Sequence, residues 1–342
     1  MQPGAGPAGG GGLPVIDVTA LRELAAGARD FDDPRVRAAA AEIDGACRRT
    51  GFFAITGHGV TPPTLAGLDA AARAFFALPD DEKSRIAMAH GGRAWRGWFP
   101  EGGELTAGRP DRKEGLYFGS ELSEDDPRVR AGLPLHGPNL FPSAVPELGP
   151  AVLDWIGRMT TLGQALLRGM SLGLGLPPDW FQVNLTADPT ILFRIFRYPP
   201  QAEGETGWGV AEHTDYGLLT ILAHDGTPGL QVRGDAGWID VDVPADVFVV
   251  NLGDMLDKMT GGRYRSTPHR VRQRGVADRL SFPFFLDPSW TAEVEPLPLK
   301  GTVPADDAGS RWDGVSVHEW SGTYGDYLTA KVARVFPDLV DG

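Results

Sequence analysis

The residues best suited to chemistry are two histidines and an aspartate. His213 and Asp215 are separated by one residue, and His269 follows much later in the chain. In an extended strand, residues two apart point to the same face, so His213 and Asp215 can converge on one metal ion. Two imidazoles and one carboxylate occupy one face of an octahedral ion and leave the other positions open. Such a set is typical of non-haem Fe(II) sites that use O2.

A second candidate site follows shortly after His269. Arg279 and Ser281 are also two residues apart, so they share one face of a strand. A guanidinium beside a hydroxyl can hold a carboxylate through charge-assisted hydrogen bonds. The sequence therefore predicts a carboxylate-binding site near the metal ligands.

The ordered set resembles the Fe(II)/2-oxoglutarate-dependent dioxygenases of the isopenicillin N synthase-like family. The matching segments are His213-Thr-Asp-Tyr-Gly-Leu-Leu-Thr, Gly229-Leu-Gln-Val-Arg, Asn251-Leu-Gly-Asp-Met, Ser266-Thr-Pro-His-Arg-Val and Arg279-Leu-Ser. The resemblance implies that His213, Asp215 and His269 bind Fe(II), and that Arg279 and Ser281 bind the 5-carboxylate of 2-oxoglutarate. It also places Tyr198 near that carboxylate, and Arg194 near the co-substrate or the substrate.

Residues 93–119 have the composition expected of a pocket wall, because aromatic residues alternate with charges and glycines. The run G-E-L-T-A-G-R-P-D resembles its counterpart in the ethylene-forming members of the family. There the glutamate that matches Glu104 helps to hold a guanidinium substrate, and Arg334 corresponds to a substrate-contacting arginine. The alternative for Glu104 is that it is a solvated loop acid, and the alternative for Arg334 is that it is an exposed helix residue. The predicted pocket aromatics are Trp98, Tyr117, Tyr216 and Phe284.

The remaining sequence predicts the elements that position these residues. Helical periodicity appears over 34–49, 62–78, 151–176 and 320–336, whereas short β-like runs occupy 13–18, 51–60, 191–198 and several segments between 218 and 285. Many short strands with long-range pairing favour a mainly β fold with α-helices, in which a jelly-roll core (a double-stranded β-helix) is flanked by helices. The metal-bearing segments would meet at one open end of this roll.

Three regions are expected within one compact unit. A disordered tail covers residues 1–12, which are rich in Gly and Pro. An N-terminal helical and substrate-side region covers 13–150. The jelly-roll oxygenase core with its flanking helices covers 151–342.

The composition restricts the partners of this 342-residue chain. Its formal net charge of -13 argues against nucleic acid or an anionic membrane as a partner. No apolar run of about 18 residues is present, so no membrane span is expected. Cys47 is the single cysteine, which excludes an intramolecular disulfide and fits a reducing cytoplasm. We therefore expect a cytoplasmic enzyme with a small-molecule substrate.

The resemblance implies oxidation of a substrate C–H bond, by hydroxylation, desaturation or cyclisation, with Fe(II), 2-oxoglutarate and O2 and with release of succinate and CO2. Natural-product biosynthesis is a typical setting. The alternatives are an isopenicillin N synthase-type iron oxidase that does not use 2-oxoglutarate, a non-catalytic jelly-roll metal-binding protein, and a zinc hydrolase. The substrate stays open among an amino acid, a natural-product intermediate and a guanidinium compound.

Overall fold

The computed structural model describes residues 12–106, 108–201, 207–272, 277–299 and 316–335, and the side chains of these residues up to Ala333. The predicted tail over 1–12 therefore lies outside the described residues, except for Gly12. The side chain of Arg334, a predicted substrate contact, also lies outside them. Within the described residues, no helix is long and apolar enough to cross a membrane.

The core consists of two β-sheets that enclose a cavity. The larger sheet has eight strands in the order β1-β2-β12-β9-β14-β7-β6-β3, and the smaller has the order β11-β10-β13-β8. The larger sheet contains β1 (Val15–Asp17), β2 (Phe52–Thr56), β3 (Gly97–Phe99), β6 (Glu114–Gly119), β7 (Pro189–Tyr198), β9 (Leu219–His224), β12 (Phe248–Leu252) and β14 (Arg279–Ser289). The smaller contains β8 (Val210–His213), β10 (Leu230–Gly234), β11 (Gly237–Val241) and β13 (His269–Val271). The arrangement confirms the predicted jelly-roll core.

Strands from both halves of the chain pair in the larger sheet. β6 pairs with β7, and β2 pairs with β12, in each case antiparallel. A short hairpin of β4 (Leu105–Thr106) and β5 (Arg109–Pro110) precedes β6. The predicted region 13–150 thus contributes strands to the same sheet as the predicted core.

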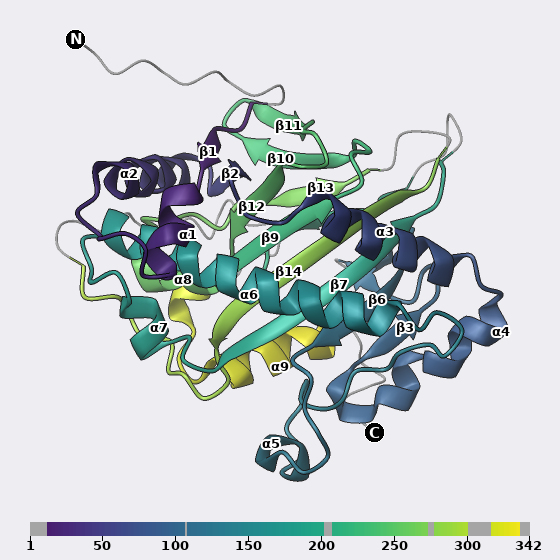
Figure 1. Cartoon of the computed structure of the whole chain (residues 1–342). Helices are drawn as coiled ribbons and strands as arrows, with labels where there is room; N and C mark the ends of the chain where they lie inside the picture. Colours follow the sequence, from purple (N-terminus) through teal and green to yellow (C-terminus); the bar gives the residue numbers. More distant parts are fainter. Residues whose placement is uncertain (1–11, 107, 202–206, 273–276, 300–315, 336–342) are drawn as a thin grey trace.

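Helices cover the outer face of the larger sheet, as Figure 1 shows for α6 (Leu148–Gly173). The N-terminal helices α1 (Thr19–Ala25), α2 (Pro34–Arg49) and α3 (Pro62–Phe76) pack against α6. The others are α4 (Asp80–Lys83), α5 (Pro127–Arg130), α7 (Trp180–Asn184), α8 (Asp254–Thr260) and α9 (Tyr324–Val335), with 3-10 turns at Ser84–Ile86, Met88–Ala94 and Val317–Glu319.

All four predicted helices are present. The helix predicted over 34–49 has these bounds, whereas the other three have shifted ends. The predicted helix 151–176 begins three residues earlier, at Leu148, and ends at Gly173. The predicted C-terminal helix 320–336 begins only at Tyr324, because a 3-10 turn precedes it. Side-chain caps explain two of the starts, since Asp33 and Thr61 accept hydrogen bonds from backbone N–H groups in the first turns of α2 and α3.

Trp155 joins α6 to the larger sheet. Its ring lies 5.8 Å from that of Phe248 on β12, and 6.4 Å from those of Phe193 on β7 and Phe282 on β14, measured between ring centroids. The side chain is fully buried. One residue of α6 therefore packs against three strands whose other face lines the cavity.

We expect Trp155→Ala to lower the free energy of unfolding by about 3–5 kcal/mol, because it leaves a cavity between α6 and the sheet. Chemical denaturation followed by circular dichroism measures this change. Leu153→Ala is the matched control, since Leu153 lies on the same helix and is 40% exposed. An equal loss in both variants would contradict this role for Trp155.

Candidate functional site

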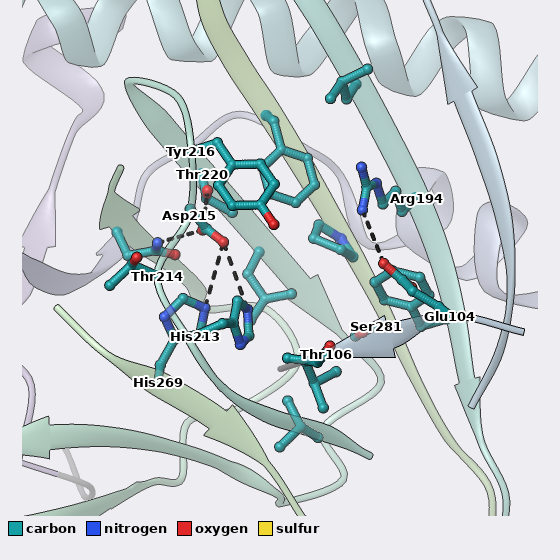
Figure 2. Close-up of a pocket in the computed structure, with 18 of the residues that line it drawn as sticks. Glu104, Thr106, Arg194, His213, Thr214, Asp215, Tyr216, Thr220, His269 and Ser281 are labelled. Atoms are coloured by element: carbon teal, nitrogen blue, oxygen red, sulfur yellow. Dashed lines mark hydrogen bonds and ion pairs between the residues drawn. The ribbon is translucent and has the colours of Figure 1, made fainter. Parts of the chain in front are cut away.

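The two predicted histidines lie directly opposite each other on paired strands. His213 at the end of β8 is the register partner of His269 at the start of β13. Asp215 follows β8, and its Oδ1 lies 3.8 Å from His213 Nε2 and 3.7 Å from His269 Nε2. The three candidate ligand atoms lie within 4.8 Å of one another. Figure 2 shows the three side chains turned toward one another, so they can reach a single ion.

Backbone carbonyls fix the orientation of both imidazoles. His213 Nδ1 hydrogen-bonds to the carbonyl of Ala211 at 2.8 Å, and His269 Nδ1 to that of Thr267 at 3.2 Å. Burial lowers the pKa of His213, and burial together with the nearby His213 lowers the pKa of His269 to about 4. Both rings are therefore neutral at physiological pH, with Nε2 free of a proton and turned toward Asp215. Metal ligation requires this form.

The Asp215 carboxylate is held by two further side chains. Its Oδ2 accepts hydrogen bonds from Thr220 Oγ1 at 2.5 Å and from Asn251 Nδ2 at 2.6 Å. Only Oδ1 then faces the histidines. Thr220 and Asn251 therefore orient the carboxylate for single-oxygen ligation.

The predicted carboxylate-binding residues lie on one face of β14 and β7. Arg279 is the register partner of Tyr198, and its guanidinium lies 5.0 Å from the centroid of the Tyr198 ring. Ser281 Oγ lies 3.4 Å from the Tyr198 hydroxyl. Arg279 Nε donates to the carbonyl of Thr227 at 3.1 Å, but Nη1 is buried and has no hydrogen-bond partner among the described residues. A buried unpaired N–H is costly, and the positive charge favours an anionic acceptor.

These groups surround one cavity of about 340 Å³. Strand alternation explains the lining along β14, where Arg279, Ser281, Pro283, Phe285 and Asp287 all face the cavity. The candidate ligands, Tyr198, Arg194, Glu104 and Tyr216 also line it. The structure thus brings together most of the predicted site residues.

Arg194 lies with Glu104 at the other end of the cavity from Arg279. Its guanidinium lies 3.9 Å from the centroid of the Tyr117 ring, and its Nη1 donates to the Tyr117 hydroxyl at 2.8 Å. The same Nη1 lies 3.6 Å from Glu104 Oε1. Arg194 precedes Tyr198 by four strand positions, or about 13 Å along β7. The hydrogen bond of Arg194 to Tyr117 and its ion pair with Glu104 therefore both lie at the end of the cavity away from Arg279.

Glu104 is a buried acid and not a solvated loop residue. It is 7% exposed, and its Oε1 accepts a hydrogen bond of 2.5 Å from the Tyr117 hydroxyl. Tyr117 does not itself line the cavity, so its contribution is to hold Glu104 and Arg194 in place.

Like Tyr117, the predicted pocket aromatics Phe284 and Trp98 do not line the cavity. Phe284 is fully buried in the core, because it alternates with Pro283 and Phe285 and so lies on the opposite face of β14. Trp98 is buried against charged partners, with Nε1 donating to Glu114 Oε2 at 3.0 Å and the Lys83 ammonium 5.1 Å from its ring centroid. The structure therefore places both side chains outside the lining of this cavity.

Sequence reasoning missed several buried polar residues around the cavity. Lys113 lines it and forms ion pairs with Glu104 and Asp111. Asp287 accepts from Leu218 N at 3.1 Å and from the Tyr324 hydroxyl at 2.5 Å, and burial raises its pKa to about 7. Extending the alternation of Arg279 and Ser281 along β14 would have found Asp287. Lys113 carries no comparable signal.

Comparisons with known proteins agree with this geometry. Residues 13–144 match the family model of the non-haem dioxygenase in morphine synthesis N-terminal domain, and residues 189–288 match that of the 2OG-Fe(II) oxygenase superfamily. The chain is 42% identical to a probable iron/ascorbate oxidoreductase of Dictyostelium discoideum, covering 96% of this chain and 95% of the relative. It is 33% identical to a homoarginine-6-hydroxylase of Arabidopsis thaliana, covering 95% and 97%.

A solved structure has the same fold. A full-length Neurospora crassa protein in complex with alpha-KG superposes with a TM-score of 0.76 at 23% identity, over 97% of this chain and 99% of that one. The chain belongs to the 2OG-Fe(II) oxygenase superfamily, in its isopenicillin N synthase-like family. It is a 2-oxoglutarate-dependent non-haem iron dioxygenase that acts on a small molecule, which confirms Fe(II), 2-oxoglutarate and O2 as the predicted cofactors.

We expect Asn251→Ala to weaken metal binding about 10- to 100-fold, because Asp215 Oδ2 loses a donor and the carboxylate can rotate. Anaerobic calorimetric titration with Fe(II) or Mn(II) measures the affinity. Asn184→Ala is the control, since that amide caps an exposed helix end through the carbonyl of Trp180. Unchanged affinity in Asn251→Ala would show that Thr220 alone orients the carboxylate.

Proposed function

We propose that His213, Asp215 and His269 hold Fe(II), while Arg279, Ser281 and Tyr198 bind the distal carboxylate of 2-oxoglutarate. The observation that supports this most directly is the unpaired Nη1 of Arg279. It belongs to the same cavity as the three converging ligand atoms. A diacid could place one carboxylate on Arg279 Nη1 and its other end on the metal ion held by the three ligands.

The bound iron, 2-oxoglutarate and O2 supply the oxidation of a substrate C–H bond, with succinate and CO2 as co-products. The side chains of the cavity bind the co-substrate and orient it. Arg279 and Ser281 each donate to the distal carboxylate, and hydrogen bonds to a charged group contribute about 1.5–3 kcal/mol each. Val210, Leu222, Leu230 and Val271 line the cavity with them and keep water from the diacid chain. These apolar side chains strengthen the charge-assisted bonds, because they lower the local dielectric.

We assign the other end of the cavity, bounded by Glu104, Arg194 and Tyr216, to the primary substrate. Arg194 then serves the substrate and not the co-substrate, since its polar contacts are with Tyr117 and Glu104. The names of two relatives specify amino acids, namely homoarginine and, at 35% identity in Dictyostelium mucoroides, 1-aminocyclopropane-1-carboxylate. A polar substrate of amino-acid size fits the charged groups at this end. Arg334 stays a predicted contact.

The surroundings of the enzyme are also part of the proposal. A net charge of -13 supports an enzyme that acts on free small molecules and not on nucleic acid. The single cysteine supports a cytoplasmic location.

The metal assignment predicts that His213→Ala abolishes Fe(II)-dependent conversion of 2-oxoglutarate to succinate, because two ligands cannot hold the ion. Succinate release is the measurement. His90→Ala is the control, since His90 is an exposed histidine far along the chain from the proposed ligands. Normal succinate release by His213→Ala would remove this residue from the metal site.

The co-substrate assignment predicts that Arg279→Ala raises the KM for 2-oxoglutarate about a hundredfold, because it removes the charge-assisted bonds to the distal carboxylate. Iron affinity, measured in the same preparations, should stay within a few-fold of wild type. Arg233→Ala removes an exposed arginine of the smaller sheet and serves as the control. An unchanged 2-oxoglutarate requirement in Arg279→Ala would place the carboxylate site elsewhere.

A further inference from the structure

Lys113 already occupies the position next to Glu104 that a cationic substrate would need. Its Nζ lies 2.9 Å from Glu104 Oε2 and 2.5 Å from Asp111 Oδ2. The side chain is 2% exposed, and its ammonium lies 4.7 Å from the centroid of the Phe196 ring. Asp111 Oδ2 also accepts from Thr106 Oγ1 at 2.7 Å. The ammonium is thus fixed between two buried carboxylates on the cavity wall.

The charges within the cluster of Glu104, Asp111, Lys113 and Arg194 balance without a ligand. Glu104 and Asp111 supply two negative charges, whereas Lys113 and Arg194 supply two positive ones. Glu104 Oε1 accepts a hydrogen bond from the Tyr117 hydroxyl. Glu104 Oε2 has the ion pair with Lys113 but no hydrogen bond of good geometry among the described residues, so the ammonium neutralises this oxygen by charge. A guanidinium or ammonium that approaches Glu104 would meet no net negative charge from these four groups. It would also lose its hydration beside two fixed cations, which is unfavourable in a buried site.

The protonation states of Glu104 and Lys113 agree with this balance, whereas burial raises the pKa of Asp111. Burial alone would lower the pKa of Lys113, but Glu104 and Asp111 raise it above its usual value. Burial opposes ionisation of Glu104, yet Lys113 and Arg194 hold its pKa below the usual value. The Glu104–Lys113 pair is therefore ionised at neutral pH.

We infer that Lys113 is a specificity-determining residue that neutralises Glu104 from within the chain and so selects against substrates with a cationic group at this end of the cavity. The inference rests on the proposed assignment of this end to the substrate. The wall then favours a polar uncharged group, which can hydrogen-bond to Glu104 or Arg194 without displacing Lys113. Removing the ammonium should open the Glu104 carboxylate to an external cation.

Two probes of the same shape test this inference. L-Homoarginine carries a guanidinium, and L-homocitrulline carries an uncharged urea on the same skeleton. Their affinities are measured calorimetrically on protein loaded with Mn(II) and 2-oxoglutarate, so that no turnover is required. We expect wild type to bind homocitrulline more tightly than homoarginine. Lys113→Met should shift the ratio toward homoarginine on the order of tenfold, whereas Lys113→Arg should keep the wild-type preference.

Lys83→Met is the matched control. Lys83 is likewise buried and paired with a carboxylate, Glu114, at 2.9 Å, but it does not line the cavity. Its loss should leave the probe ratio unchanged. Lys113→Met leaves two buried carboxylates without their cation. If this variant does not fold for that reason, the double variant Asp111→Asn with Lys113→Met is used, because it removes one carboxylate together with the ammonium and keeps Glu104.

Two results would overturn the inference. One is tighter binding of homoarginine than of homocitrulline by wild type. The other is no gain in homoarginine affinity in any folded variant that lacks the Lys113 ammonium. Titration of the Mn(II) protein with 2-oxoglutarate alone separates this failure from failure of the proposed function. That titration tests the Arg279 end of the cavity and does not depend on Lys113.

Discussion

The antiparallel pairing of β8 with β13 is the constraint on which the rest of the site depends. It sets His213 opposite His269, although many residues separate them in the chain. Asp215 completes the set only because the chain leaves β8 immediately after His213, and because Thr220 and Asn251 hold the far carboxylate oxygen. Those two residues lie on β9 and β12, in the other sheet. The proposed metal site therefore lies where the two sheets meet.

The same alternation that builds the strands separates the cavity from the core. Along β14, Arg279, Ser281 and Asp287 face the cavity, whereas Phe282 and Phe284 face α6 and its neighbours. A one-residue shift in register would exchange charged and aromatic side chains between these faces, at a cost that a buried strand cannot tolerate. The Trp155 contact with Phe282 fixes this register from the outer side. The position of the carboxylate-binding residues thus depends on packing on the other face of the strand.

Local spacing explains why the grouping of His213 with Asp215, and of Arg279 with Ser281, was predictable. Residues two apart in a strand share a face, and this holds whatever the strand pairs with. The four longer helices were predictable in approximate extent for a similar reason, since periodicity is local. Residues 93–119 do contribute to the cavity wall, but the sequence does not reveal which of their side chains do so. The sequence around Trp98, for example, does not reveal that Glu114 lies beside its indole. The role of Glu104 likewise depends on Lys113 and Tyr117, which reach it only after β4, β5 and β6 have formed.

The C-terminal helix α9 shows how strongly the metal loop is tied to distant sequence. Tyr324 donates to Asp287 at 2.5 Å, and Asp287 in turn accepts from the backbone N–H of Leu218, just past the metal loop. Tyr327 donates to Asp254 at 3.1 Å, while the Asp254 backbone N–H donates to the carbonyl of Asp215 at 2.8 Å. Leu328 and Val332 of the same helix line the cavity. Helix α9, which contributes to the cavity wall, is therefore hydrogen-bonded through two buried aspartates to both sides of the loop that carries Asp215, the proposed ligand. A buried carboxyl that loses such a donor is left unsatisfied, so displacement of α9 and distortion of the metal loop are energetically linked.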